Sequence, residues 1–132
     1  MRHAIIGALL LSAAAGPALA QGVPAATAPR FVSVSDASAL SSNLIGLNVT
    51  NAGGQTIGEI KDVVLTAEKG IAGFIVSVGG FLGMGEHYVV VDPTAVVIGY
   101  NAGDKKWTAK MNATADQLKA APAFKYEGKW RS

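Results

Sequence analysis

Between Leu44 and Asn112 the sequence alternates short runs of β-branched and aromatic residues with turns rich in glycine and asparagine. Runs of this length, separated by such turns, indicate short strands joined by hairpins and tight loops. Strands of this number and spacing are typical of a small barrel or a sandwich. The expected strands cover residues 44–50, 56–66, 71–79, 87–92, 95–100 and 107–112.

The second run contains a break in its alternation. Ile57, Val63 and Leu65 have the same parity, whereas Ile60 has the other. Successive residues of a strand point to opposite faces of the sheet, so this break predicts a β-bulge or bend near Gly58. Strands of a small barrel need such a bend to curve.

One short helix is expected after the last strand. Thr114 and Gln117 have the spacing of a capping box, in which each side chain bonds the backbone amide of the other residue. Pro122 ends the helix after about two turns, and a helix of that length needs to pack on the barrel to be stable. Phe124 and Tyr126 follow, and we expect them to pin the tail to the same surface.

The N-terminus has the pattern of a secretory signal peptide. A short basic start, Met1–His3, precedes an apolar run from Ala4 to Ala15, and Gly16-Pro17 then interrupts it. Ala18–Ala20 supplies the small-x-small pattern of a signal peptidase site. The apolar run is shorter than the ~20 residues of a membrane-spanning helix. We therefore expect cleavage after Ala20, a periplasmic or secreted protein, and no transmembrane anchor after cleavage.

The composition of the next segment predicts a linker. Residues 21–43 are rich in Ala, Ser and Pro, with few charges and little to form a core. The sequence leaves open whether Phe31, Val32 and Val34 form a short edge strand. The expected organisation is a signal peptide at 1–20, a flexible linker at 21–43, a barrel domain at 44–126 and a tail at 127–132.

Charge and cysteine content narrow the function. Cleavage of the signal peptide would remove Arg2 and leave 10 Lys and Arg residues and 9 Asp and Glu residues, so the mature chain would have a net charge of +1. The basic residues are scattered, which argues against nucleic-acid binding, because that function normally shows a basic stripe. The chain has no cysteine, so disulfides, thiol nucleophiles, cysteine-based zinc sites and iron–sulfur clusters are excluded.

A glycine-dense loop is the candidate interaction site. A dinucleotide fingerprint needs G-x-G-x-x-G between a strand and a helix. In this loop Gly80, Gly83 and Gly85 have the reverse spacing, G-x-x-G-x-G, and a strand follows instead of a helix. No lysine lies in the loop to meet a phosphate. Its apolar side chains either form an exposed contact surface or plug the end of the barrel. The loop residues are Gly80, Phe81, Leu82, Gly83, Met84 and Gly85.

The remaining polar residues do not form a recognisable catalytic or metal-binding set. Glu86 and His87 are neighbours on a strand and point to opposite faces, so we expect a solvent-facing histidine and no metal site. Glu59 and Asp62 are three apart, and Asp62 is expected to bond backbone amides. Ser77 has no nearby histidine for a hydrolase triad. We therefore predict no enzymatic activity, no catalytic residues and no cofactor.

Three segments, in this order, resemble the PRC-barrel family. The first comprises Leu44–Gly46 and Gln55–Val63, which are similar to the opening hairpin with its G-x-I/V-x-D-V core. Ser77–Glu86 and Asp116–Phe124 are similar to the glycine-rich and C-terminal segments of the exported bacterial branch. The family is named after the cytoplasmic domain of the photosynthetic reaction-centre H subunit. The expected cleavable signal argues against a role in photosynthetic electron transfer.

The resemblance implies a small, six-stranded antiparallel barrel that binds proteins and has no catalytic residues. We therefore expect an exported, non-enzymatic interaction or scaffold module that contacts a protein partner, or a second copy of itself, through the apolar loop. The alternative is a small-ligand or envelope-stress binding protein that uses the mouth of the barrel. An enclosed polar cavity would favour the ligand, and an exposed apolar patch would favour the protein partner.

The signal-peptide interpretation predicts the first residue of the exported protein. Intact-mass measurement of protein recovered outside the cytoplasm should give a chain that begins at Gln21, because the small residues Ala18 and Ala20 fit the peptidase site. Uncleaved protein recovered from the membrane fraction would contradict the prediction.

Overall fold

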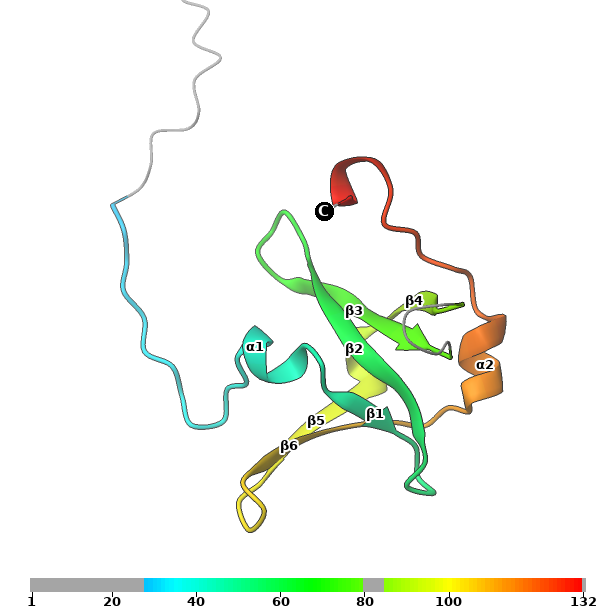
Figure 1. Cartoon of the computed structure of the whole chain (residues 1–132). Helices are drawn as coiled ribbons and strands as arrows, with labels where there is room; N and C mark the ends of the chain where they lie inside the picture. The colour runs from blue at the N-terminus through cyan, green and yellow to red at the C-terminus, as the bar shows by residue number, and fades with distance from the viewer. Residues whose placement is uncertain (1–27, 80–84, 132) are drawn as a thin grey trace, which may run out of the picture. The chain divides into compact units, whose positions relative to one another are not determined.

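The structure, a computed structural model, describes residues 28–79 and 85–131 (Figure 1). A compact unit begins at Ser35, and residues 28–34 have no regular secondary structure, so no strand forms at Phe31–Val34. In chain order, the helices, strands and 3₁₀ turns (η) are α1 (Ser41–Leu44), β1 (Asn48–Thr50), β2 (Thr56–Leu65), β3 (Ile71–Val78), β4 (His87–Val91), η1 (Pro93–Ala95), β5 (Val96–Asn101), β6 (Lys106–Met111), α2 (Ala115–Ala120) and η2 (Gly128–Trp130).

The strands form one mixed six-stranded sheet in the order β4-β3-β2-β1-β6-β5. All neighbours are antiparallel except β1 and β6, which pair in parallel through Val49 with Ala109 and Thr50 with Lys110. The expectation of a purely antiparallel sheet is therefore wrong at this pair. The β5–β6 hairpin is far from β1 in the sequence, so no tight turn forces the two strands to run in opposite directions.

The sheet is rolled but not closed, because β4 and β5 form its two edges and do not pair. In a flat six-stranded sheet these edges would lie about 24 Å apart, at about 4.8 Å per strand. The link from Val91 to Val96 contains only Asp92 and η1, and it can span at most about 18 Å. A flat sheet is therefore impossible, and the strands in Figure 1 change direction progressively from β3 to β5.

The first strand is shorter than the pattern predicted. Leu44 ends α1, and Gly46 has a positive φ of +89°, so β1 begins only at Asn48. The backbone still pairs with β2 across this break: the amide of Gly46 donates to the carbonyl of Ile60 at 2.8 Å. Leu44 is consequently buried in the core as a helical residue.

Strand β2 contains the irregularity that its sequence predicted. Its register against β1 skips Ile57, and its register against β3 skips Lys61. Each extra residue shifts the alternation by one position. As a result Ile57, Ile60 and Val63, which are three residues apart, all face the core, although a regular strand would turn Ile60 away from the other two.

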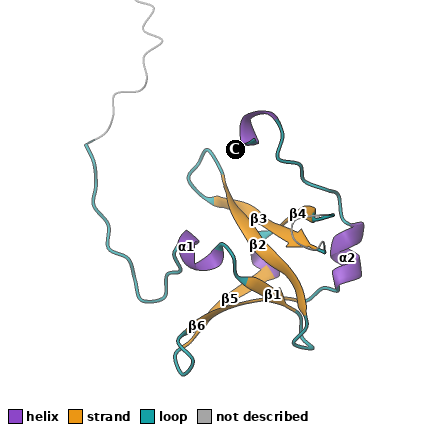
Figure 2. Cartoon of the chain, viewed as in Figure 1, coloured by secondary structure: helices purple, strands orange, loops and turns teal. Residues whose placement is uncertain are grey.

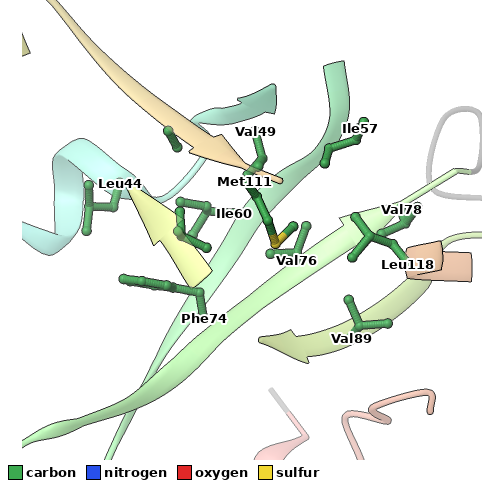
Figure 3. Packing of buried hydrophobic residues seen from close by; sticks show 12 residues of the cluster. Leu44, Val49, Ile57, Ile60, Phe74, Val76, Val78, Val89, Met111 and Leu118 are labelled. Atoms are coloured by element: carbon green, nitrogen blue, oxygen red, sulfur yellow. The ribbon is translucent and has the colours of Figure 1, made fainter. Parts of the chain in front are cut away.

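The core lies inside the curve of the sheet and is entirely apolar (Figure 3). Ile60, Val49 and Val76 are fully buried at its centre. The helices α1 and α2 lie beside the sheet (Figure 2). Leu44 from α1 and Leu118 from α2 belong to the same cluster (Figure 3). The capping box of α2 is confirmed: the Thr114 hydroxyl accepts from the Gln117 amide at 3.1 Å, and the Gln117 side chain accepts from the Thr114 amide at 2.9 Å.

Gly58 of β2 lies in close contact with β3. A β-carbon added at Gly58 would lie 2.6 Å from Val76 Cγ1 and 2.8 Å from the Ser77 carbonyl oxygen. Gly58→Ala should lower the free energy of unfolding by about 1–3 kcal/mol through overpacking, as measured by urea denaturation.

The matched control is Gly70→Ala in the β2–β3 turn. There the added carbon would meet only the Thr66 hydroxyl at 3.5 Å, so we expect a change within about 0.5 kcal/mol or a slight gain. Equal effects of the two substitutions would contradict the close-packing argument.

Candidate functional site: an apolar groove beneath the C-terminal segment

Most of the glycine loop lies outside the described residues. This applies to Gly80, Phe81, Leu82, Gly83 and Met84, so their role as an interaction loop stays a prediction. Gly85 is described; it is exposed, with a positive φ of +73°. Such a backbone conformation favours glycine and fits a sharp turn into β4.

His87 was expected to face solvent, and this expectation is wrong. Its side chain is half-buried, and its Nε2 atom lies 2.9 Å from the carbonyl oxygen of Ala121, the residue that caps the C-terminus of α2. The last carbonyls of a helix have no partner within the helix. The histidine therefore joins β4 to the end of α2.

Strand β3 is buried on both faces, which indicates a second covered surface. Phe74, Val76 and Val78 face the core, whereas Ile75 has only 3% of its surface exposed and lies outside the core cluster. Ile75 pairs with Asp62 of β2 and Val90 of β4, so all three lie on the outer face of the sheet. Something other than the core must therefore cover this face.

The cover is the C-terminal segment that follows α2. The amide of Phe124 donates to the carbonyl of Tyr88 at 2.7 Å, which forms an antiparallel bridge to the outer edge of β4. Beyond this bridge the chain continues through Tyr126 to η2. Phe124 and Tyr126 pin the tail as predicted, but they pin it to the outer face at β4. The expectation that helix and tail share one surface is wrong, because Leu118 of α2 packs into the core.

Aromatic rings hold the segment in place. Tyr126 packs edge-on against Tyr88, with ring centroids 5.3 Å apart, and against Phe124, with centroids 5.1 Å apart. Trp130 lies 5.7 Å from Phe124. Contacts of this geometry add about 0.5–1.5 kcal/mol each beyond the burial of their area.

An apolar groove of about 290 Å³ remains between the sheet and the C-terminal segment. Its floor is the outer face of β2, β3 and β4, and its wall is the row of aromatic rings. We call it the outer groove; its main lining residues are Asp62, Val64, Ile75, Val90, Phe124, Tyr126 and Trp130.

Two carboxylates set the electrostatics of this region. Glu86 accepts a hydrogen bond from the Tyr88 hydroxyl and raises the pKa of Tyr88 to about 12, with burial and the Glu86 charge adding to the shift. Burial raises the pKa of Tyr126, and the Asp62 carboxylate adds to this through its charge and as a hydrogen-bond acceptor. Asp62 also accepts from the neighbouring amide of Val63 at 3.0 Å, so it does bond a backbone amide.

Neither a metal centre nor a membrane helix is evident in the described part of the chain. Among residues 28–79 and 85–131, no group of three or more histidine, aspartate or glutamate side chains is placed to hold a metal ion. None of the helices in the same ranges has the length and hydrophobicity needed to cross a bilayer.

The outer groove was not predicted from the sequence. Asp62 was noted as a backbone partner and the aromatic tail as an anchor, but their meeting depends on a bulge that turns Asp62 outward. The only usable signal was the pairing of a broken β alternation with an aromatic segment at the C-terminus.

The Tyr88–Glu86 pair predicts an alkaline titration. Folded Tyr88 has a pKa of about 12, above the value of about 10 for an unfolded tyrosine. Its stabilising contribution is therefore present below about pH 10 and is lost as the pH rises through about 12. Glu86→Gln should lower the pKa of Tyr88, as measured by NMR of ¹³C-labelled tyrosine rings. Glu127→Gln, a nearby control, should leave it unchanged; titration of wild-type Tyr88 near 10 would contradict the prediction.

The comparisons with known proteins agree with this architecture. No curated protein matched the chain. The family model of the PRC-barrel domain matches residues 38–113, more than half of the 132 residues, and this range contains all six strands. The rolled six-stranded sheet is consistent with that fold. This chain therefore belongs to the PRC-barrel domain family.

Proposed function

We propose that this PRC-barrel protein is exported and acts as a non-catalytic protein-interaction module, with the outer groove and its rim as a contact surface. The observation that carries the proposal is the exposure of large apolar side chains around the groove. These exposed residues, which we call the rim of the groove, are Leu65 (70% exposed), Trp130 (57%) and Val90 (46%). Clustered apolar surface of this kind commonly marks an interface in soluble proteins.

The inside of the sheet supports a protein partner over a small ligand. The core is filled by apolar side chains. Among the described residues, no buried side-chain nitrogen or oxygen lacks a hydrogen-bond partner. A site for a small molecule usually combines an apolar cavity of about 300–1,000 Å³ with a few convergent polar groups. At about 290 Å³ the outer groove lies at the small end of that range, a size that also suits one side chain of a larger partner.

Export is supported by the N-terminal sequence alone. The basic start at Arg2, the apolar run and the Ala18-Leu19-Ala20 site direct the chain out of the cytoplasm in this proposal. The glycine loop at residues 80–85 remains a candidate for a second contact.

Site-specific photo-crosslinking in the native cell tests the proposed surface. A photoreactive phenylalanine analogue at position 65 should crosslink to one defined protein, because this position is 70% exposed at the rim of the groove. The matched control is position 97 on β5, which is 66% exposed and does not line the groove. Products are separated by gel and identified by mass spectrometry.

Thermal unfolding of both labelled proteins confirms that each is folded. Trp130→Ala should reduce the yield from position 65, because it removes an exposed ring of the rim. No product from position 65, or the same products from positions 65 and 97, would contradict the outer groove as the contact surface.

A further inference from the structure

Asp62 is the one charged side chain among the described residues that line the outer groove. It is half-buried and surrounded by aliphatic and aromatic side chains. The one ion pair among the described residues joins Lys61 to Glu59, so within that part of the chain no cation neutralises Asp62. A carboxylate in apolar surroundings gains strongly from a partner of opposite charge.

The carboxylate also retains hydrogen-bonding capacity. It accepts from the Val63 amide, and the Tyr126 hydroxyl is its second neighbour. An ionised carboxylate has about four acceptor positions on its two oxygens. Positions therefore remain for a donor that enters the groove from outside.

The aromatic wall suits a flat cation. Trp130 already has a cation against its ring, since Lys129 Nζ lies 5.2 Å from the ring centroid. The ring is 57% exposed and so remains accessible to a partner. Tyr126 and Phe124 continue the same wall. Aromatic faces attract guanidinium and ammonium groups, and more strongly where water is excluded.

The size and shape of the site favour arginine. A groove of about 290 Å³ fits one long side chain. Guanidinium is planar, is more weakly hydrated than ammonium, stacks on aromatic rings and pairs with a carboxylate through two parallel hydrogen bonds. Lysine has a compact, strongly hydrated charge and offers neither the stacking nor the paired geometry.

We propose that the outer groove binds an arginine side chain of a partner protein, with its guanidinium paired to Asp62 and its plane against the aromatic wall. This inference rests on the proposed interaction function and specifies what that surface selects. The aliphatic part of the arginine covers Ile75 and Val90, and the charged end reaches the carboxylate.

NMR titration of the ¹⁵N-labelled protein with the peptide acetyl-Gly-Arg-Gly-amide tests the proposal. Shifts should concentrate at the Asp62 and Ile75 amides and at the Trp130 indole, with saturation in the millimolar range. Acetyl-Gly-citrulline-Gly-amide has nearly the same shape without the charge and should bind at least about 10-fold more weakly. The corresponding lysine peptide should also bind more weakly than the arginine peptide.

Variants separate charge from architecture. Asp62→Asn retains an acceptor for Tyr126 and Val63 but removes the charge, and it should weaken the arginine peptide about 10-fold. Asp104→Asn is the control, because Asp104 is exposed in the β5–β6 turn, where it accepts from Asn101 at 3.0 Å. It should leave the affinity unchanged.

Tyr126→Phe removes the hydroxyl beside Asp62 while keeping the ring and the charge, so the arginine peptide should still bind. The proposal is overturned if Asp62→Asn binds the arginine peptide as tightly as the wild type does. It is also overturned if the citrulline or lysine peptide binds equally well, or if the groove residues do not shift.

The two proposals fail in different ways. If crosslinking from position 65 persists undiminished in Asp62→Asn, the interaction function stands and the arginine inference is wrong. If the arginine peptide binds as expected but position 65 captures no protein in the cell, the groove has the stated chemistry and the proposed function is wrong.

Discussion

The bulge at Lys61 determines both the interior and the exterior of this domain. In a regular strand Ile60 and Asp62 would share a face, and the carboxylate would point into the apolar core. The extra residue shifts the alternation, so Ile60 and Val63 face inward while Asp62 pairs with Ile75 on the outer face. Burial of an unpaired carboxylate costs several kcal/mol in an apolar interior. One irregularity therefore bends β2 and keeps a charge out of the core.

The outer face in turn depends on the C-terminal segment. Ile75 and its neighbours would be exposed apolar surface on a rolled sheet that is too small to cover them with a second layer. The tail covers them with little regular structure: one backbone bridge at Phe124, the His87 contact to the end of α2, and edge-on packing of Tyr126 on Tyr88. Because the chain has no cysteine, it cannot use disulfides here and relies on such packing.

The sequence predicted the local structure well and the long-range pairing less well. The six strands, the capping box of α2 and the bend in β2 follow from alternation, turn residues and spacing, which act over a few residues. The parallel pairing of β1 with β6 does not, because it joins segments about 60 residues apart whose relative direction no turn constrains. Leu44 was expected in a strand because a short apolar run has no distinct period. The sequence feature that marks the break between this helix and the strand is Gly46, which takes a positive φ.

The candidate site shows the same division. The phenylalanine and tyrosine of the tail were recognised as anchors from their type, but the outer groove arises only where the tail meets a face that the bulge has defined. Asp62 then has two roles that follow from one position: it lies beside the Tyr126 hydroxyl and supplies the unbalanced charge of the groove. A cation that pairs with Asp62 would lie beside Tyr126, which lines the same groove and anchors the tail. A ligand that binds only the anchored form stabilises it by mass action, which gives the C-terminal segment a part in recognition as well as in covering the sheet.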